Sequence, residues 1–521
     1  METTHILTDT NATQARKPMR QTALSIGMFI LAMAGYHLLF WNESYGVNIF
    51  IFNLFVTAWL LYTQHKAFNQ RNTLISALIT LLFSVLTVIN GSDLAKFNYN
   101  LSLIVFVGFV FHPNIKSILN AFPTGFLNFI FAFWSNCKLV VLSLMTFDKF
   151  PSFRRNFKFV LLPSVALFLF FLIFKFANPV FDDFTKGFIN YIAQLIDNFF
   201  DLLSPIWLFF ILFGAIVVSG VSSNGRVSLF AKYDATCSDI IERKHTQSYF
   251  DFSIKTIGLK DELKTGIILI LAVNILLIIE NIIDINWIWI NFELSETKTY
   301  AQLVHEGTYL LILSILLSMG ILFYYFRNNQ NFYSKNKWLK RGAYLWITQN
   351  IVLVISVIIR NLRYIEQYGL TYRRIGVLVF LALTCFGLIT LCIKVKTKKS
   401  FFYMLRTNTF ALYLFMSLFT CFNWDSIIIN YNLNMQQSAH IDKEYLLSFS
   451  DNTLPIIDQH KEYFREKQSV AITDTIQTRM SNDDRIGQRI GCYKADIKSS
   501  TESILSWNYQ KYLAEKYFGG K

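Results

Sequence analysis

Two adjacent side chains, His305 and Glu306, are the first residues in this sequence that could do acid–base or metal chemistry. A zinc peptidase needs a second histidine four positions after the first, so that both ligands lie on one helix face. That position holds Tyr309, and no cluster of His and Cys supplies another ligand. The sequence therefore predicts no metal site and no cofactor. The simpler interpretation is a polar cap at a membrane interface, with the tyrosine in the aromatic belt.

Four arginines form a second group, on either side of one short connection. Arg360 and Arg363 close an apolar run, and Arg373 and Arg374 open the next. Arginine is disfavoured on the outer side of a membrane, so the cluster favours a site for an anionic group such as a lipid phosphate. The alternative is that the guanidinium groups extend to headgroups or form structural ion pairs. The candidate binding residues of this outer face are His305, Glu306, Tyr309, Arg360, Arg363, Tyr364, Tyr368, Arg373 and Arg374.

Polar side chains also interrupt two apolar runs. Asn274 and Glu280 lie in one, and Gln349 and Asn350 lie in another. Polar groups inside a membrane face the interior of the bundle and often mark a transport pathway. A proton relay normally needs a longer chain of such groups, and the sequence contains neither a P-loop nor a GxSxG motif. A transporter is therefore an alternative, not the favoured function.

The composition indicates that these residues sit on membrane helices. The chain has 521 residues, of which 53% are hydrophobic and 16% charged, whereas a soluble domain has about 25% charged residues. About 20 apolar residues cross a bilayer. The sequence thus predicts an all-α, polytopic bundle of about 11 spans, near residues 22–41, 46–64, 73–90, 99–113, 159–178, 204–221, 264–283, 303–326, 342–360, 375–394 and 407–424.

The positive charge follows the membrane topology. Twelve basic and twelve acidic residues lie from Asn430 onward, which leaves 36 basic and 22 acidic residues in 1–429. The excess falls in alternate short connections, as the positive-inside rule requires. It therefore predicts no nucleic-acid partner, a cytoplasmic N-terminus and, with an odd number of spans, an extracytoplasmic C-terminal tail.

The chain divides where its composition changes. A long mixed-charge connection separates two apolar halves, and a soluble, helix-prone tail follows the last apolar run. The predicted parts are a cytoplasmic N-terminal segment (1–21), a first membrane half (22–221), a cytoplasmic insert (222–262), a second membrane half carrying the motifs (263–424) and an extracytoplasmic helical tail (425–521).

Two segments do not fit a simple alternation of spans. Residues 118–147 are apolar but are interrupted by Pro123 and by polar residues, and both flanks are basic. We expect an interfacial or re-entrant hairpin there, with two short crossings as the alternative. Residues 183–202 alternate at helical spacing, which predicts an amphipathic helix on the outer surface.

Several motifs carry a resemblance to a known family. In chain order they are His305-x-Gly307-x-Tyr309, Gln349-Asn350, Arg360-x-x-x-Tyr364-x-x-x-Tyr368-Gly369-Leu370-Thr371-x-x-Arg374, Asn430-Tyr431-Asn432-Leu433, Glu444-Tyr445-Leu446-Leu447-Ser448-x-Ser450, Pro455 and Ser506-Trp507-Asn508. Together they resemble a bacterial integral-membrane family catalogued as a domain of unknown function, number 4173, with number 4153 as its close relative. The resemblance covers roughly residues 260–521. It implies a multi-span membrane protein with a short soluble tail, and it carries no established activity.

The expected function follows from the side on which the motifs lie. We expect a plasma-membrane protein whose outer face binds membrane lipids, anionic ones in particular, or an envelope protein partner, in a regulatory or envelope-maintenance role without catalysis. The alternatives are a secondary transporter and a membrane enzyme acting on a lipid-linked substrate. In the tail, Tyr445, Leu446, Trp507 and Tyr509 either add to the binding surface or pack the tail onto the bundle, and packing is the favoured interpretation.

Overall fold

The computed structural model describes most of the chain. The described residues are 27–146, most of 163–191, 204–243, 258–290, 308–435 apart from 328, 441–464, 482–499 and 503–519. Among them the regular elements are helices, and a single isolated bridge joins Ile240 to Lys399. Two compact units emerge: the first comprises Met1–Ala77, Leu103–Pro113 and Ala121–Ala231, and the second comprises Leu78–Ser102, Asn114–Asn120 and Lys232–Lys521.

Fewer helices than predicted have the length and composition of a membrane span. Within the described residues seven qualify, or eight if the bent pair α15 (Phe401–Thr420) and α16 (Trp424–Asn434) forms one span. The count of about eleven is therefore not confirmed. Three of the predicted runs extend into residues that the structure does not describe. The qualifying helices are α3 (Arg71–Asn90), α4 (Asp93–Phe111), α5 (Ile118–Thr146), α8 (Pro205–Ser222), α10 with η2 (Leu259–Asp284, Ile285–Ile290), α13 (Lys337–Tyr368) and α14 (Tyr372–Thr397).

Four predicted spans correspond to shorter or partly described helices. Three of them lie in the helix Gly27–Phe40, in α2 (Val47–Thr63) and in α12 (Tyr309–Tyr325). At about 1.5 Å per residue, the 17 residues of α12 rise about 26 Å, slightly less than a hydrocarbon core of about 30 Å. The fourth, near 159–178, falls partly outside the described residues, as does the predicted amphipathic helix 183–202.

The region 118–147 is one helix instead of a hairpin. Helix α5 continues for 29 residues through Pro123, so the re-entrant expectation is corrected, while an interfacial position stays a prediction. Its start is held by the buried carboxylate of Asp234, from α9 (Leu229–Thr236) in the insert. Asp234 accepts hydrogen bonds from the backbone N–H of Lys116 (2.7 Å) and Ser117 (3.2 Å) and from Nδ2 of Asn120 (2.9 Å). A carboxylate in this position satisfies the donors that open a helix and suits its dipole.

The insert is also fastened to the connection between α14 and α15. The carboxylate of Asp239 accepts a hydrogen bond from Nη2 of Arg406 at 2.7 Å, and its carbonyl accepts one from Ser400 N–H at 2.9 Å. Ile241 N–H donates to the carbonyl of Lys398 at 3.0 Å. These hydrogen bonds attach residues 239–241 of the insert to the α14–α15 connection within the second unit.

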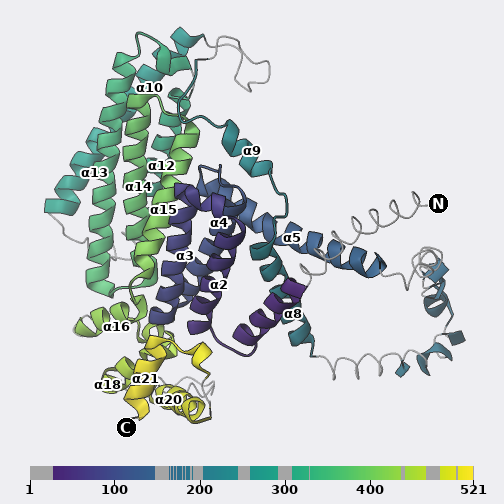
Figure 1. Cartoon of the computed structure of the whole chain (residues 1–521). Coiled ribbons are helices and arrows are strands. Elements are labelled where there is room, and N and C mark those ends of the chain that lie inside the picture. The colour runs from purple at the N-terminus through teal and green to yellow at the C-terminus, as the bar shows by residue number, and fades with distance from the viewer. Residues whose placement is uncertain are drawn as a thin grey trace, which may run out of the picture. The chain divides into compact units, whose positions relative to one another are not determined.

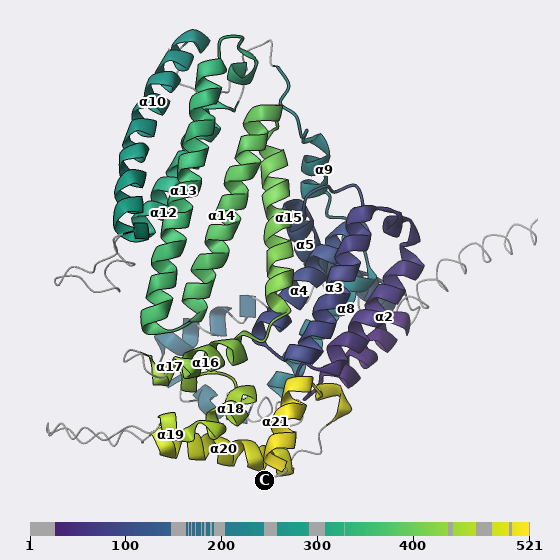
Figure 2. The ribbon, with the colours of Figure 1, turned by 90° about the vertical axis from the view of Figure 1, so that its left-hand side faces the viewer.

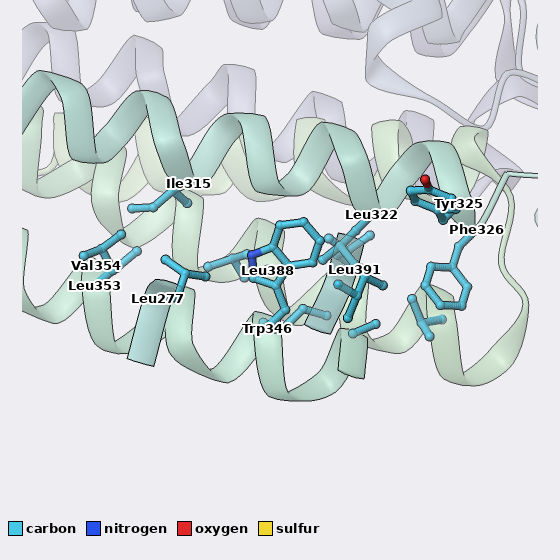
Figure 3. Packing of buried hydrophobic residues seen from close by; sticks show 14 of the residues in the cluster. Leu277, Ile315, Leu322, Tyr325, Phe326, Trp346, Leu353, Val354, Leu388 and Leu391 are labelled. Carbon is cyan, nitrogen blue, oxygen red and sulfur yellow. The ribbon is translucent and has the colours of Figure 1, made fainter. Parts of the chain in front are cut away.

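Helices α10, α12, α13, α14 and α15 lie side by side in the second unit (Figures 1 and 2). Helix α13 packs on α10, α12 and α14, and α14 packs on α15. Their core is apolar and dense: Trp346 of α13 is 1% exposed and lies among Leu322, Leu388 and Leu391 (Figure 3). Helix α15 is further bonded to the α3–α4 region, where Nδ2 of Asn98 donates to Oγ1 of Thr420 at 2.6 Å.

The tail folds as a small helical module at one end of this bundle (Figure 2). Its buried core includes Leu446, Leu454 and Phe464, and it also takes in Ile375 from α14. We call this end, where α13 turns into α14, the tail end. The opposite end, where α12 and α14 finish and α13 and α15 begin, is called the basic end. The tail helices are α17 (Lys443–Leu447), α18 (Leu454–Gln459), α19 (Lys461–Phe464), α20 (Asn482–Ser499) and α21 (Tyr509–Gly519), after α16.

Candidate functional site

The two helices that carry most of the predicted polar residues pack directly on each other. Helix α10 buries one stripe at intervals of three and four residues, formed by Leu263, Gly266, Ile270, Asn274, Leu277, Asn281 and Asp284. This periodicity places one continuous face of the helix against its neighbour. We call the contact between this stripe and α13 the polar seam, because three of its seven members are polar.

Two predicted residues meet in the middle of the polar seam. Nε2 of Gln349 donates to Oδ1 of Asn274 at 2.5 Å, and Nδ2 of Asn274 donates to the carbonyls of Ile270 (2.7 Å) and Gly342 (3.1 Å). About two turns further along α10, Nδ2 of Asn281 donates to the Gln349 carbonyl at 3.3 Å. Amide side chains that bond across two membrane helices hold those helices together.

The other two intramembrane residues stay apart from this contact. Asn350 is fully buried, and its Nδ2 donates to the carbonyl of Trp346 in its own helix at 2.8 Å. Glu280 is half-buried and takes part in none of the seam's hydrogen bonds among the described residues. The structure thus joins Asn274 to Gln349 and leaves Glu280 and Asn350 outside the pair.

Arg360 ends the polar seam in a buried ion pair. Its Nη2 binds Oδ1 of Asp284, and the two side chains are 6% and 2% exposed. The guanidinium also lies 5.8 Å from the ring of Trp287. Within the described part of the chain, Nε of Arg360 and Oδ2 of Asp284 have no hydrogen-bond partner. The pair is therefore water-excluded but incompletely satisfied.

Arg374 is a structural cap of α13. Its Nη1 donates to the carbonyls of Tyr368 (2.8 Å) and Gly369, and its guanidinium stacks 4.2 Å from the ring of Tyr364. Gly369 has φ +80, a conformation that glycine adopts without the steric cost of a Cβ. A cation beside these orphan carbonyls complements the negative end of the helix dipole. Nδ2 of Asn361 adds a bond to the Arg374 carbonyl at 3.0 Å.

The remaining predicted residues lie outside this internal network. The side chain of Arg363 is 42% exposed and lies 3.9 Å from Glu366, and Arg373 is exposed. Tyr309 is 59% exposed, while His305 and Glu306 lie outside the described residues. The four arginines therefore do not converge: two are used inside the protein, and two reach the surface near the α13–α14 turn.

The tail holds the α13–α14 turn through polar contacts. Oδ1 of Asn432 accepts a hydrogen bond from Leu370 N–H at 2.7 Å, and its Nδ2 donates to the Leu370 carbonyl at 2.8 Å. The hydroxyl of Tyr372 donates to Asp425 at 2.6 Å, and Tyr372 N–H donates to the hydroxyl of Tyr445 at 3.0 Å. Burial raises the pKa of Tyr445, which keeps this phenol neutral.

Among the tail residues singled out from the sequence, two pack and two do not. Leu446 is fully buried and Tyr445 is half-buried, whereas Trp507 and Tyr509 are 37% and 44% exposed. Two partners were not predicted from the sequence: Asp284, which pairs with Arg360, and Asp425, which accepts a hydrogen bond from Tyr372. Asp284 continues the helical spacing of Asn274 and Asn281, which is a usable signal for a seam residue.

No group of three or more His, Cys, Asp or Glu side chains that could hold a metal ion occurs in the regions that the structure covers.

A domain of unknown function, DUF4153, matches residues 49–460. The chain belongs to this family. The sequence motifs pointed first to domain 4173 and named 4153 as its relative, so the match corrects the number and keeps the kind of family. Neither curated proteins nor solved structures gave a match. Its apolar helices and this family indicate that the chain is an integral membrane protein of unknown activity.

Proposed function

We propose that this protein acts by binding, without catalysis, and that its tail end takes an anionic lipid headgroup in a regulatory or envelope-maintenance role. The observation that supports it is the pair of exposed guanidinium groups of Arg363 and Arg373 beside the α13–α14 turn. Guanidinium groups suit phosphate geometry through their planar array of donors. A partner protein with an acidic surface is the other form of the same proposal.

The frame that carries these two arginines is rigid. Arg374 caps the end of α13, Asn361 bonds across to α14, and Asn432 grips the turn from the tail. Preorganised donors lose less conformational entropy on binding. Glu366 lies at the long distance of 3.9 Å from Arg363, and both groups are exposed, so their attraction is weak. The side chain of Arg363 is 42% exposed and reaches the surface beside the turn.

The polar seam supports a scaffold role over transport. Its amides bond to each other and to backbone carbonyls of the facing helix, and Leu277 and Trp346 fill the space around them. Such interhelical hydrogen bonds are typical of contacts that hold two membrane helices together. The enzyme alternative depends on His305 and Glu306, which lie outside the described residues.

The lipid proposal is tested by counting bound lipids on the purified protein. Delipidated protein is incubated with dioleoyl phosphatidylglycerol or dioleoyl phosphatidylcholine and examined by native mass spectrometry. At about 1 kcal/mol per surface Lys or Arg, the variant Arg363→Gln/Arg373→Gln should bind the anionic lipid at the tail end about tenfold to thirtyfold more weakly. The control Lys335→Gln/Lys337→Gln removes two exposed charges at the basic end and should leave that binding unchanged. Equal binding of the two lipids, or unchanged binding of the anionic lipid by the arginine variant, would refute the lipid site. The proposal of an acidic partner protein would then be the one left to test.

The predicted orientation, in the plasma membrane with the tail outside, has a separate test. Cys492 lies exposed on α20 and is the cysteine of the tail. With the other five cysteines replaced, a membrane-impermeant maleimide should label intact cells. Labelling only after lysis would place the tail, Arg363 and Arg373 in the cytoplasm. The arginines would then follow the ordinary positive-inside rule, and an outer-face site would be ruled out.

A further inference from the structure

A crevice of about 400 Å³ lies at the basic end of the second unit, away from the tail end. Its lining residues come from the last turns of α12, from the end of α14 and from the start of α15. They are Gly320, Phe323, Tyr324, Arg327, Lys394 and Phe401. The crevice thus combines two cations with three aromatic walls, a composition suited to an amphipathic anion.

The polar part of the crevice is built around a buried ammonium group. Lys394 is 1% exposed, and its Nζ donates to the carbonyl of Phe326 at 2.5 Å. An ammonium has three donors, of which the described hydrogen bonds use one, and Nζ also lies 5.4 Å from the ring of Phe323. Arg327 stacks 3.8 Å from the ring of Tyr324 and lies 3.9 Å from Glu262. Two cations and one neighbouring carboxylate give the crevice a net positive charge.

The apolar part opens onto the surface of the bundle. The rings of Phe323 and Phe401 pack edge-to-face with centroids 5.3 Å apart, and Tyr324 and Phe401 are 49% and 57% exposed. Gly320 lines the same crevice and leaves open space there, since a Cβ built on it meets no atom within 4 Å. The outer surface of a membrane helix at this depth contacts acyl chains, so the crevice connects lipid tails to the buried ammonium.

We propose that this crevice binds one anionic phospholipid from the leaflet at the basic end. The phosphate would lie against Lys394 and Arg327, and the first acyl carbons would run along Gly320, Phe323 and Phe401. A basic pocket between membrane helices is the setting in which lipid phosphates are recognised. A free phosphate would use the cations but not the aromatic walls, so the amphipathic lining favours a lipid. This site is separate from the one proposed at the tail end.

The test fills the crevice without touching its charges. Gly320→Leu places a side chain in the open space and improves helix propensity, so the fold is preserved. Gly35→Leu is the matched control, because a Cβ at that glycine also meets no atom within 4 Å and it lies in the first unit. Delipidated protein is titrated with dioleoyl phosphatidylglycerol, dioleoyl phosphatidylcholine or inorganic phosphate, and bound lipid is counted by native mass spectrometry.

The expected result is a tightly held phosphatidylglycerol, additional to the one proposed at the tail end, whose binding Gly320→Leu weakens by about tenfold or more and Gly35→Leu leaves unchanged. Arg327→Gln should weaken it while leaving phosphatidylcholine unaffected, since only the anionic headgroup uses the guanidinium. Arg363→Gln/Arg373→Gln should leave this lipid in place, which separates the crevice from the tail-end site. Equal retention in Gly320→Leu and the native protein would overturn the proposal. Displacement of the lipid by millimolar inorganic phosphate would assign the cations to a soluble anion and would also overturn it.

Discussion

Breaking the buried ion pair between Asp284 and Arg360 should destabilise the protein more than removing both of its members. The two side chains are 2% and 6% exposed, so a charge left alone there has no access to water. Removing one partner of a buried pair costs about 3–5 kcal/mol, because the other charge stays uncompensated. Asp284→Leu and Arg360→Met should each show a loss of this size.

The double variant is expected to recover most of that loss. Replacing a buried pair with apolar side chains of similar volume is often neutral or stabilising by about 1–4 kcal/mol. Here the pair leaves Oδ2 of Asp284 and Nε of Arg360 without partners in the described structure, which lowers its net contribution further. Asp284→Leu/Arg360→Met should therefore be about as stable as the native protein.

Thermal unfolding in detergent, followed by tryptophan fluorescence, measures both effects. Trp287 lies 5.8 Å from the guanidinium of Arg360 and provides a local signal. A change of 1 kcal/mol moves Tm by about 2–4 °C in domains of 150–250 residues, so each single variant should unfold about 6–20 °C lower. Arg363→Met, at an exposed arginine nearby, is the control and should shift Tm little. A double variant as unstable as the sum of the single variants would refute the pairing.

Three further predictions address the tail, the insert and the first unit. Asn432→Ala removes both bonds to the α13–α14 turn, which should cost about 1–3 kcal/mol and accelerate amide exchange in the turn and in the tail. Asp234→Ala leaves the start of α5 without its cap, so amide exchange should rise at residues 116–120 and stability should fall by about 0.5–2 kcal/mol. Gly125→Ala would place a Cβ 1.9 Å from the carbonyl oxygen of Ile104 and should destabilise the α4–α5 contact by about 1–3 kcal/mol or more, whereas Gly27→Ala meets open space and should be neutral.

The sequence predicted the class of fold because membrane helices need long apolar runs. It predicted the number of spans less well. Three of the predicted runs, near 22–41, 159–178 and 303–326, extend past the described residues, so their helices are counted only in part. At 118–147 polar residues predicted a break, and the helix continues because those residues bond to the end of α8. Nδ2 of Asn128 donates to the carbonyls of Gly220 (2.8 Å) and Ser223 (3.1 Å), and Nδ2 of Asn136 donates to Oγ of Ser223 at 3.0 Å. These contacts span 87 to 95 positions of sequence.

The arginines could be singled out from the sequence because they break the positive-inside pattern. Their structural roles depend on contacts with partners that the sequence pattern does not reveal. Arg360 conflicts with the charge pattern, and its explanation is a carboxylate 76 positions earlier. Arg374 serves carbonyls five and six residues before it, so its cap could have been predicted from Gly369 and helix-end chemistry. Partners on other helices are harder to predict, because each pairing depends on which helix faces meet.

The two ends of the bundle use buried cations in different ways, and this difference decides where a ligand can bind. At the tail end Arg360 has a carboxylate partner and Arg374 has carbonyl partners, so neither draws an anion inward and only surface groups remain for binding. At the basic end Lys394 is as buried as Arg360, whereas Arg374 is half-buried, and Lys394 has one carbonyl partner beside an open crevice. A buried charge is costly unless it is fully compensated, and an anion in that crevice would supply the missing compensation. Burial alone thus does not mark a binding site; burial together with incomplete compensation and an opening to the surface does.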